Sequence, residues 1–195
     1  LVQGWSFTTE TAAPVPEVIA KTPTGSDVPV ATNTISVTFD KNVTATSGVS
    51  LVLSTANNPN VATITTAAMS ATSGNTTGTD IATFTIPTTV SLDYGTTYTV
   101  TLAAGSFQDA TNANNAVHSW NFTTEAKPYV TSIKRSNPTV EMTNATSVQF
   151  TVTFDKAPPA ITLASNVFGA DWAGSDHVLS VTGVSGSGTS YTVTV

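Results

Sequence analysis

Apolar and polar residues alternate along most of this chain. Residues 35–39 read ISVTF, 81–86 IATFTI, 98–102 YTVTL, 148–154 VQFTVTF and 191–195 YTVTV. A period of two places the apolar side chains of a strand on one face and the polar ones, here mostly threonine, on the other. No stretch shows a sustained helical period, and Gly, Pro, Asn and Asp separate the strands. The pattern therefore predicts an all-β chain of antiparallel sheets packed as sandwiches.

Three blocks of sequence occur twice and in the same order. Residues 5–10 (WSFTTE) return as 120–125 (WNFTTE), and residues 37–41 (VTFDK) return as 152–156, both at an offset of 115. The third block, GTTYTVT at 95–101, returns as GTSYTVT at 188–194, at an offset of 93. Matched blocks in one order predict a tandem repeat whose second copy has a shorter middle.

The repeats and the prolines predict the domain boundaries. The WxFTTE block closes a domain, because linker prolines follow both copies, at Pro14 and at Pro128. We expect residues 14–125 to form one complete domain. Residues 1–10 are interpreted as the closing strand of a preceding domain, or as a donor strand, and residues 127–195 as a second domain that lacks its last strand.

The composition narrows the function classes. Charged residues make up only 9% of the chain, against about 25% in ordinary soluble proteins, while 40 Thr and 20 Ser supply polarity. A surface that depends on hydroxyls suits the outside of a cell. The net charge is −6 with six Lys and Arg, which excludes the basic patch that nucleic acid or an anionic membrane requires. No apolar run approaches the roughly 20 residues of a membrane-spanning helix, and the absence of cysteine excludes thiolate chemistry and disulfides.

Several segments of residues 14–125 form a recognisable set: Pro23 with Gly25, and residues 35–41, 94–100, 104–109 and 120–124. They resemble the bacterial Ig-like domains of S-layer proteins, surface adhesins and large exported proteins. Asp109 is followed by ATNANN, without the Gly-Asn that this family usually carries there. Residues 180–189 resemble a related Ig-like type. The resemblance implies tandem immunoglobulin-like antiparallel β-sandwiches at the cell surface or outside the cell.

Candidate catalytic residues are few. His118 enters a strand and is interpreted as an exposed residue at a strand edge. His177 has Asp171 and Asp176 nearby, but adjacent residues of an extended strand point to opposite faces, so Asp176 is badly placed to orient His177 as a triad would need. The other acids are scattered singly, without the paired carboxylates of a hydrolase. We expect no catalytic residues, no cofactor and no enzyme activity.

Calcium is the one ion that the sequence brings into consideration. A tight calcium site usually combines several carboxylates, whereas each candidate segment here has one, so solvated loops with Asx turns are the favoured interpretation. The candidate ligands are Asp109 with Asn112, Asn114 and Asn115 in one loop, and the linker acids Glu10 and Glu125.

The tryptophans divide into two kinds. Trp5 and Trp120 alternate in phase with Phe7 and Phe122, so we expect them to face a core. Trp172 lies in an irregular segment and is the candidate ligand contact, where a sugar ring could stack.

The sequence therefore predicts a structural module of an exported cell-surface, S-layer or extracellular filament protein. Its expected partners are neighbouring Ig-like domains or copies of itself, arranged head-to-tail. A sharper version is polymerisation by strand donation, in which Trp5 and Phe7 of residues 1–10 fill an open edge of residues 127–195 in a neighbouring molecule; the other interpretation is a section of a longer array. The alternative function is an adhesin or carbohydrate-binding accessory module that contacts surface glycans through Trp172.

Overall fold

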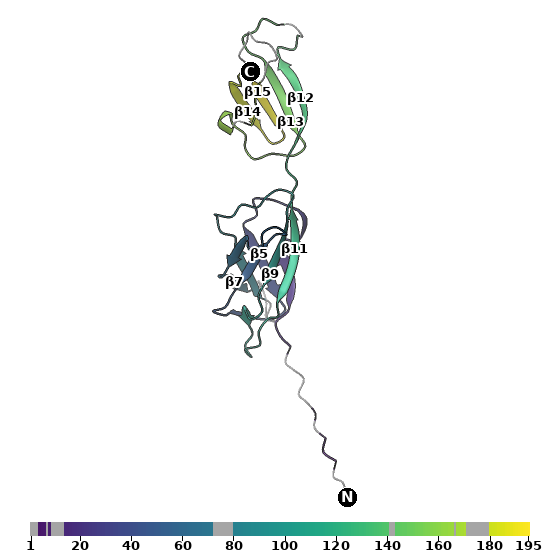
Figure 1. Cartoon of the computed structure of the whole chain (residues 1–195), viewed down its shortest axis with the longest axis vertical. Coiled ribbons are helices and arrows are strands. Elements are labelled where there is room, and N and C mark those ends of the chain that lie inside the picture. Colours follow the sequence, from purple (N-terminus) through teal and green to yellow (C-terminus); the bar gives the residue numbers. More distant parts are fainter. Residues whose placement is uncertain are drawn as a thin grey trace. The chain divides into compact units, whose positions relative to one another are not determined.

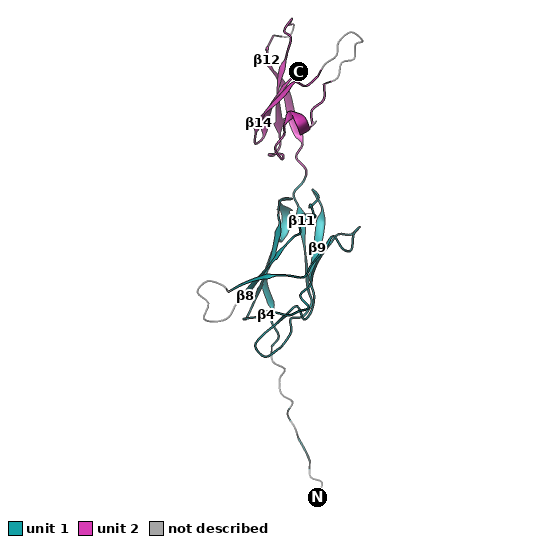
Figure 2. Ribbon diagram, turned by 90° about the vertical axis from the view of Figure 1, so that its left-hand side faces the viewer, with its two compact units in different colours: residues 1–126 teal, residues 127–195 magenta. Residues whose placement is uncertain are grey.

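The computed structural model describes residues 4–6, 8, 14–71, 80–140, 143–165, 167–170 and 180–195. The chain divides into two compact units, unit 1 (residues 1–126) and unit 2 (residues 127–195), shown in two colours in Figure 2. Among the described residues all regular structure is strand, except one 3-10 turn at Leu163–Ser165. The predicted all-β fold is confirmed.

Unit 1 is a sandwich of two sheets (Figure 1). The β3 sheet has the order β1-β3-β8-β7, with β1 at Val18–Thr22, β3 at Thr34–Phe39, β8 at Asp80–Thr85 and β7 at Ala68–Ala71. The β9 sheet has the order β2-β11-β9-β5-β6, with β2 at Gly25–Val28, β11 at His118–Thr124, β9 at Thr97–Leu102, β5 at Leu51–Ser54 and β6 at Ala62–Ile64. A short ribbon joins β4 (Thr44–Ala45) to β10 (Phe107–Gln108). Among the described strand pairs only β2 and β11 are parallel.

The core of unit 1 follows the alternation in the sequence. In β3, Ile35, Val37 and Phe39 are completely buried, whereas the polar residues between them lie on the outer face. Each such side chain contributes about 1.5–3 kcal/mol by leaving water. The rings of Phe39 and Phe107 lie 5.0 Å apart, and Phe107 meets Phe84 edge-on at 6.2 Å. Phe107 therefore joins the short ribbon to the core.

The outer faces of unit 1 carry hydroxyl pairs between neighbouring strands. Such pairs satisfy part of each other's hydrogen-bonding capacity and stabilise a sheet without charges. The oxygen atoms of these pairs lie 2.8 Å apart in Thr22–Ser36, 2.9 Å in Thr97–Thr123 and 3.0 Å in Thr101–Ser119.

The described residues of unit 2 form one antiparallel sheet with the order β12-β13-β15-β14. These strands are β12 at Val130–Asn137, β13 at Gln149–Phe154, β15 at Ser190–Thr194 and β14 at Gly183–Ser187. The cluster of buried side chains on this sheet consists of Val152, Phe154, Tyr191 and Val193.

Strand pairing corrects the correspondence of the third repeated block. Val37 of β3 pairs with Ala82 of β8, and its counterpart Val152 of β13 pairs with Tyr191 of β15. Tyr191 thus takes the position of Ala82, not that of Tyr98 in β9. The match at an offset of 93 is therefore a similarity of sequence between two strands that occupy different positions in their sheets. The unit 2 sheet is the counterpart of the β3 sheet. Alternation assigns the faces of a strand, but it does not name the neighbours of that strand.

Candidate functional site

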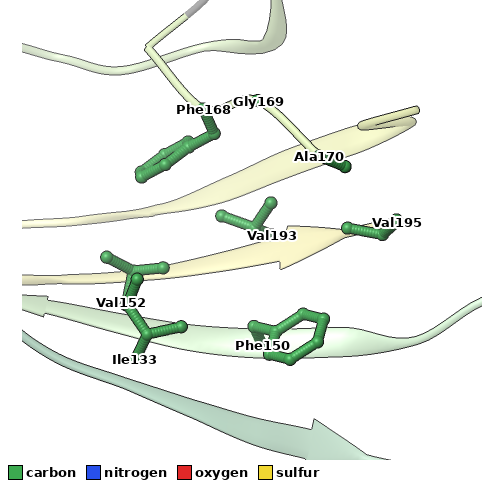
Figure 3. A pocket seen from close by; sticks show the side chains of 8 residues that line it. All are labelled: Ile133, Phe150, Val152, Phe168, Gly169, Ala170, Val193 and Val195. Carbon is green, nitrogen blue, oxygen red and sulfur yellow. The ribbon is translucent and has the colours of Figure 1, made fainter. Parts of the chain in front are cut away.

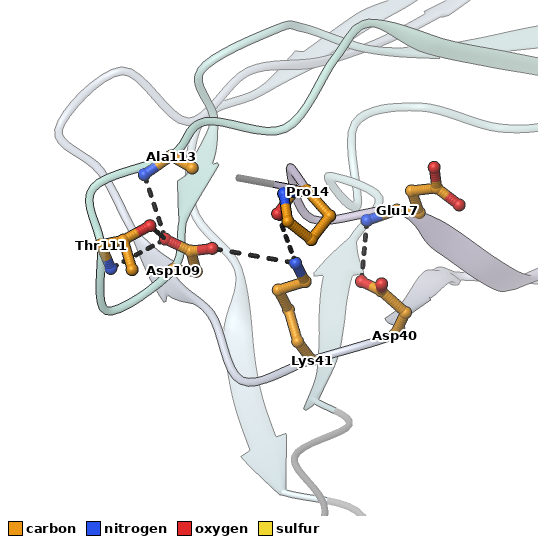
Figure 4. A network of polar contacts seen from close by, with 7 residues as sticks. All are labelled: Pro14, Glu17, Asp40, Lys41, Asp109, Thr111 and Ala113. Atoms are coloured by element: carbon orange, nitrogen blue, oxygen red, sulfur yellow. Dashed lines mark hydrogen bonds and ion pairs between the residues drawn. The ribbon is translucent and has the colours of Figure 1, made fainter. Parts of the chain in front are cut away.

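The chain enters unit 1 through a group of polar contacts at the end of β3 (Figure 4). The backbone N–H of Glu17 donates to Oδ1 of Asp40 at 2.8 Å, and the N–H of Asp40 donates to the carbonyl of Glu17 at 3.0 Å. The ammonium group of Lys41 donates to the carbonyl of Pro14. Two side chains from the end of one strand therefore hold the backbone that leads into β1.

Lys41 also faces the loop that follows β10. Its Nζ lies 3.9 Å from Oδ2 of Asp109, while Oδ1 of Asp109 accepts hydrogen bonds from Thr111 N (2.9 Å), Thr111 Oγ1 (2.6 Å) and Ala113 N (3.0 Å). The hydrogen bond from the Thr111 hydroxyl is the main cause that lowers the pKa of Asp109, with smaller contributions from the two backbone N–H groups and Lys41. Asn112 adopts a left-handed backbone with φ of 63°, which asparagine tolerates better than most residues. The turn therefore forms without the glycine.

The loop's polar atoms are occupied by the fold rather than arranged around an ion. Asn115 is buried; its Oδ1 accepts from Phe107 N at 2.8 Å and its Nδ2 donates to the carbonyls of Ala103 and Ala116. Asn114 is exposed, and a cation at Asp109 would have to displace Lys41. Glu125 lies elsewhere in unit 1, where its Oε1 accepts from Val30 N at 3.2 Å. In the part of the chain that the structure describes, no three residues among His, Cys, Asp and Glu gather as a metal site would need.

A second group of hydrogen bonds holds the chain where it leaves unit 1, at the end of β11. The hydroxyl of Thr124, which is 2% exposed, donates to the carbonyl of Asp93 at 2.6 Å and accepts from Thr96 N at 2.9 Å. The next residue, Glu125, donates from its N–H to the carbonyl of Val28 and accepts from Gly95 N, both at 2.8 Å. The last strand is therefore fixed to β2 on one side and to the turn before β9 on the other.

Between these two groups of contacts, β1 and β2 run alongside β11 in the same direction. The successive contacts are Lys21 with His118, Pro23 with Trp120, Gly25 with Phe122 and Val28 with Thr124. Residues 21–28 and 118–124 thus run parallel to each other. Consequently the chain enters at one end of unit 1 and leaves at the other (Figure 1).

His118 is half-buried at the beginning of β11, not exposed at a strand edge as the sequence suggested. Its Nε2 lies 3.1 Å from Nζ of Lys21. Because an ammonium group can only donate, Nε2 is the acceptor and the ring is neutral. Burial, with the charge of Lys21 second, lowers the pKa of His118. The contact joins the β3 sheet to the β9 sheet, and its partner is a lysine rather than the acid or serine of a catalytic triad.

The inner face of the unit 2 sheet forms an apolar hollow of about 290 Å³ (Figure 3). Phe150 is half-buried there, whereas its counterpart Ile35 in unit 1 is completely buried beneath the β9 sheet. The described residues of the lining contribute only apolar side chains, namely Ile133, Phe150, Val152, Phe168, Gly169, Ala170, Val193 and Val195. This part of the hollow therefore suits another apolar side chain.

The candidate tryptophans differ in their surroundings. Trp120 is 7% exposed, in agreement with the pattern, whereas Trp5 is 93% exposed and lies outside any strand. Trp120 has β9 and β2 beside its strand, and that is the difference between two segments of nearly the same sequence. Other predicted positions lie outside the described residues, namely Phe7, Glu10, Asp171, Trp172, Asp176 and His177.

Sequence reasoning missed the roles of three residues. Asp40 and Lys41 stand in the repeated VTFDK block, so their recurrence was a signal, although it did not identify the backbone that they hold. Thr124 is in phase with Trp120 and Phe122, and that parity could have placed its hydroxyl inside.

Comparison with known proteins places this architecture. The family model for the bacterial Ig-like domain matches residues 12–124, from the linker before β1 to the end of β11. The chain belongs to the bacterial Ig-like domain family. No curated protein matches it. Bacterial Ig-like domains occur in surface or extracellular proteins and are generally non-catalytic structural modules. Among the described residues, no helix is long and apolar enough to cross a membrane.

Proposed function

We propose that this chain is a structural spacer of an exported cell-surface protein, and that unit 1 transmits tension along its length. The observation that supports this proposal is that residues 21–28 run parallel to β11 and contact it along their length. Tension applied to the linker before β1 and to the chain after β11 pulls these neighbouring segments in opposite directions. The chain's expected location is extracellular, and this role requires no catalytic group.

The direction of pulling decides how strongly the sandwich resists. Each hydrogen bond contributes only about 0.5–1.5 kcal/mol net, so bonds that break one after another yield at low force. Contacts loaded in shear must break together, because each lies across the direction of motion. Forced unfolding depends on the unfolding barrier rather than on the equilibrium stability. A module with this arrangement therefore resists tension even when its equilibrium stability is ordinary.

Single-molecule force spectroscopy tests the proposal directly. The chain has no cysteine, so a pair of introduced cysteines defines the pulling points. Pulling between Glu17→Cys and Ala126→Cys loads β2 and β11 in shear. The control pulls between Glu17→Cys and Asn42→Cys, which lie at the same end of the antiparallel pair β1–β3 and peel it open. We expect a several-fold higher unfolding force in the first geometry; equal forces in the two geometries would refute the proposal.

Strand donation is the second candidate, and the exposure of Trp5 supports it. Residues 5–10 match residues 120–125, which overlap β11, at five of six positions, and the hollow of unit 2 is lined by apolar side chains. However, β11 is held by both β9 and β2 in unit 1, so a donated strand would also need strands beside it. Light scattering on the chain with and without residues 1–10 decides the matter. Long assemblies that vanish on trimming support donation, and equal monomers contradict it.

The alternative function expected from the sequence, an adhesin or glycan-binding module, depends on Trp172. None of the described residues adds support to it.

A further inference from the structure

We infer that Asp40 after β3, and its counterpart Asp155 after β13, is a clamp that fixes the linker entering each unit. The purpose of this clamp rests on the proposed spacer role, because a spacer needs a defined direction at each joint. Its existence rests on contacts that occur independently in the two units.

The aspartates make the same two contacts in both units. Asp40 accepts from Glu17 N at 2.8 Å and donates to Glu17 O at 3.0 Å. Asp155 accepts from Tyr129 N at 2.8 Å and donates to Tyr129 O at 3.1 Å. One residue thereby grips both polar groups of the backbone opposite it, through its own N–H and its carboxylate.

The clamped residue stands at the same place in the chain each time. Glu17 follows Pro16, and Tyr129 follows Pro128. Because proline has no N–H, the amide of the following residue is the first donor available after it, and the aspartate takes this donor. The register then shifts at equivalent places, between Val18 and Ala20 in β1 and between Val130 and Ser132 in β12. The sequence signature is therefore Pro-x-Val followed, at the end of the partner strand, by Phe-Asp-Lys.

In unit 1, Lys41 extends the clamp further upstream. Its ammonium group reaches the carbonyl of Pro14, three residues before Glu17, and faces the carboxylate of Asp109. Asp109 is itself held by Thr111 and Ala113. The linker is thus connected to a hydrogen-bonded loop of the sandwich, so its direction is set by the fold rather than by the linker alone.

Amide hydrogen exchange on the full chain tests the clamp. In Asp40→Ala, we expect the Glu17 amide to exchange at least about tenfold faster, since it loses its acceptor, while the Tyr129 amide is unchanged. Asp155→Ala should give the reverse result, so that each variant is the control of the other. Asp40→Asn keeps an acceptor oxygen, and we expect it to retain most of the protection of Glu17.

The amide of Val37, in the middle of β3, separates a local effect from unfolding of unit 1, and the amide of Val152, in β13, does the same for unit 2. If Glu17 and Tyr129 keep their protection in the respective alanine variants while Val37 also stays protected, the clamp does not exist. If Asp40→Ala unfolds unit 1, Val37 exchanges fast as well, and Asp155→Ala and Asp40→Asn decide.

For the lysine, we expect Lys41→Met to lower the order parameter of the Val15 amide from about 0.85 to below about 0.6; an unchanged value would mean that Lys41 is not part of the clamp. Failure of the pulling experiment would leave these amide results unaffected, so the two proposals fail separately.

Discussion

The indole Nε1 of Trp120 donates a hydrogen bond to the backbone carbonyl of Pro23 at 2.9 Å. This contact joins the last strand of unit 1 to the joint between β1 and β2, which belong to different sheets. Trp120 thus contributes to the core with its ring and to the parallel run with its nitrogen. Trp5 is followed, after one residue, by the same Phe-Thr-Thr-Glu sequence as Trp120, yet it is 93% exposed.

Trp120→Phe should therefore destabilise unit 1. The substitution removes the only side-chain donor of the ring, leaves the carbonyl of Pro23 without this partner, and reduces buried apolar area. We expect a loss of about 1–3 kcal/mol in the free energy of unfolding, measured in urea from the NMR signals of β9. The matched control is Trp5→Phe, which should stay within about 0.5 kcal/mol because Trp5 is 93% exposed. Equal losses in the two variants would contradict this account of Trp120.

Thr124→Val should weaken the hydrogen bonding that holds the end of β11. Valine keeps the shape of threonine but neither donates to Asp93 O nor accepts from Thr96 N. Polar groups left without a partner in a buried place cost about 1–3 kcal/mol of stability. The unfolding force of unit 1 should also fall, because these hydrogen bonds lie among the contacts that tension on β11 loads. Thr123→Val is the control, since the Thr123 hydroxyl pairs with Thr97 on the exposed face. We expect it to change stability by no more than about 0.5 kcal/mol. A larger effect at position 123 would overturn the distinction.

Residue parity explains how much the sequence could predict. The burial of Ile35, Val37 and Phe39 and of Trp120 followed from a period of two, because alternation alone decides which side chains share a face. The same rule could have placed Thr124 inside, although its position between Thr123 and Glu125 gives no sign that its hydroxyl has two partners. Faces are local properties, and the sequence records them well.

Neighbours are not local properties. Tyr191 stands in a block that matches β9, but hydrogen bonds to β13 give it the position of Ala82 in β8. Either assignment buries an apolar side chain, so the pattern could not choose between them. The contact of Asp40 with Glu17 likewise spans 23 residues, and no spacing rule joins an acid at a strand end to a backbone N–H so far away. The candidate site consists of such contacts, which is why the fold was predictable and most of the site was not.

The stability of unit 1 should decrease as the pH is lowered, because of His118. Its pKa is lowered in the folded state, so the unfolded chain binds the proton more readily and stability rises with pH. This contribution is complete above the ordinary value of about 6.5 and is lost as the pH falls toward the folded pKa. We expect His118→Gln to reduce the difference in melting temperature between about pH 5 and pH 8. An NMR titration should show Lys21→Met moving the pKa of His118 upward; no movement would mean that Lys21 does not influence the ring.

Gly186→Ala should disrupt the hairpin of β14 and β15. Gly186 has φ of +131°, and a Cβ there would lie 2.4 Å from the carbonyl oxygen of Ser190 and 2.7 Å from Cα of Tyr191. Both are backbone atoms of the paired strand, so relief requires the strands to separate. Because Tyr191 is buried in the unit 2 cluster, this movement also disturbs the core. We expect a loss of about 3 kcal/mol or more for unit 2, with the NMR signals of unit 1 unchanged.

Gly188→Ala distinguishes this close contact from backbone strain alone. Gly188 lies in the two-residue loop of the same hairpin with φ of +61°, and no atom lies within 4 Å of the added Cβ. Alanine there meets only the cost of a left-handed backbone, about 1–2 kcal/mol. The two variants differ by two positions in one hairpin, so a larger loss at Gly186 measures the contact with β15. If Gly188→Ala proved as damaging as Gly186→Ala, β14 and β15 would be free to shift apart. The hollow of unit 2 would then lack the fixed sheet on which its shape depends.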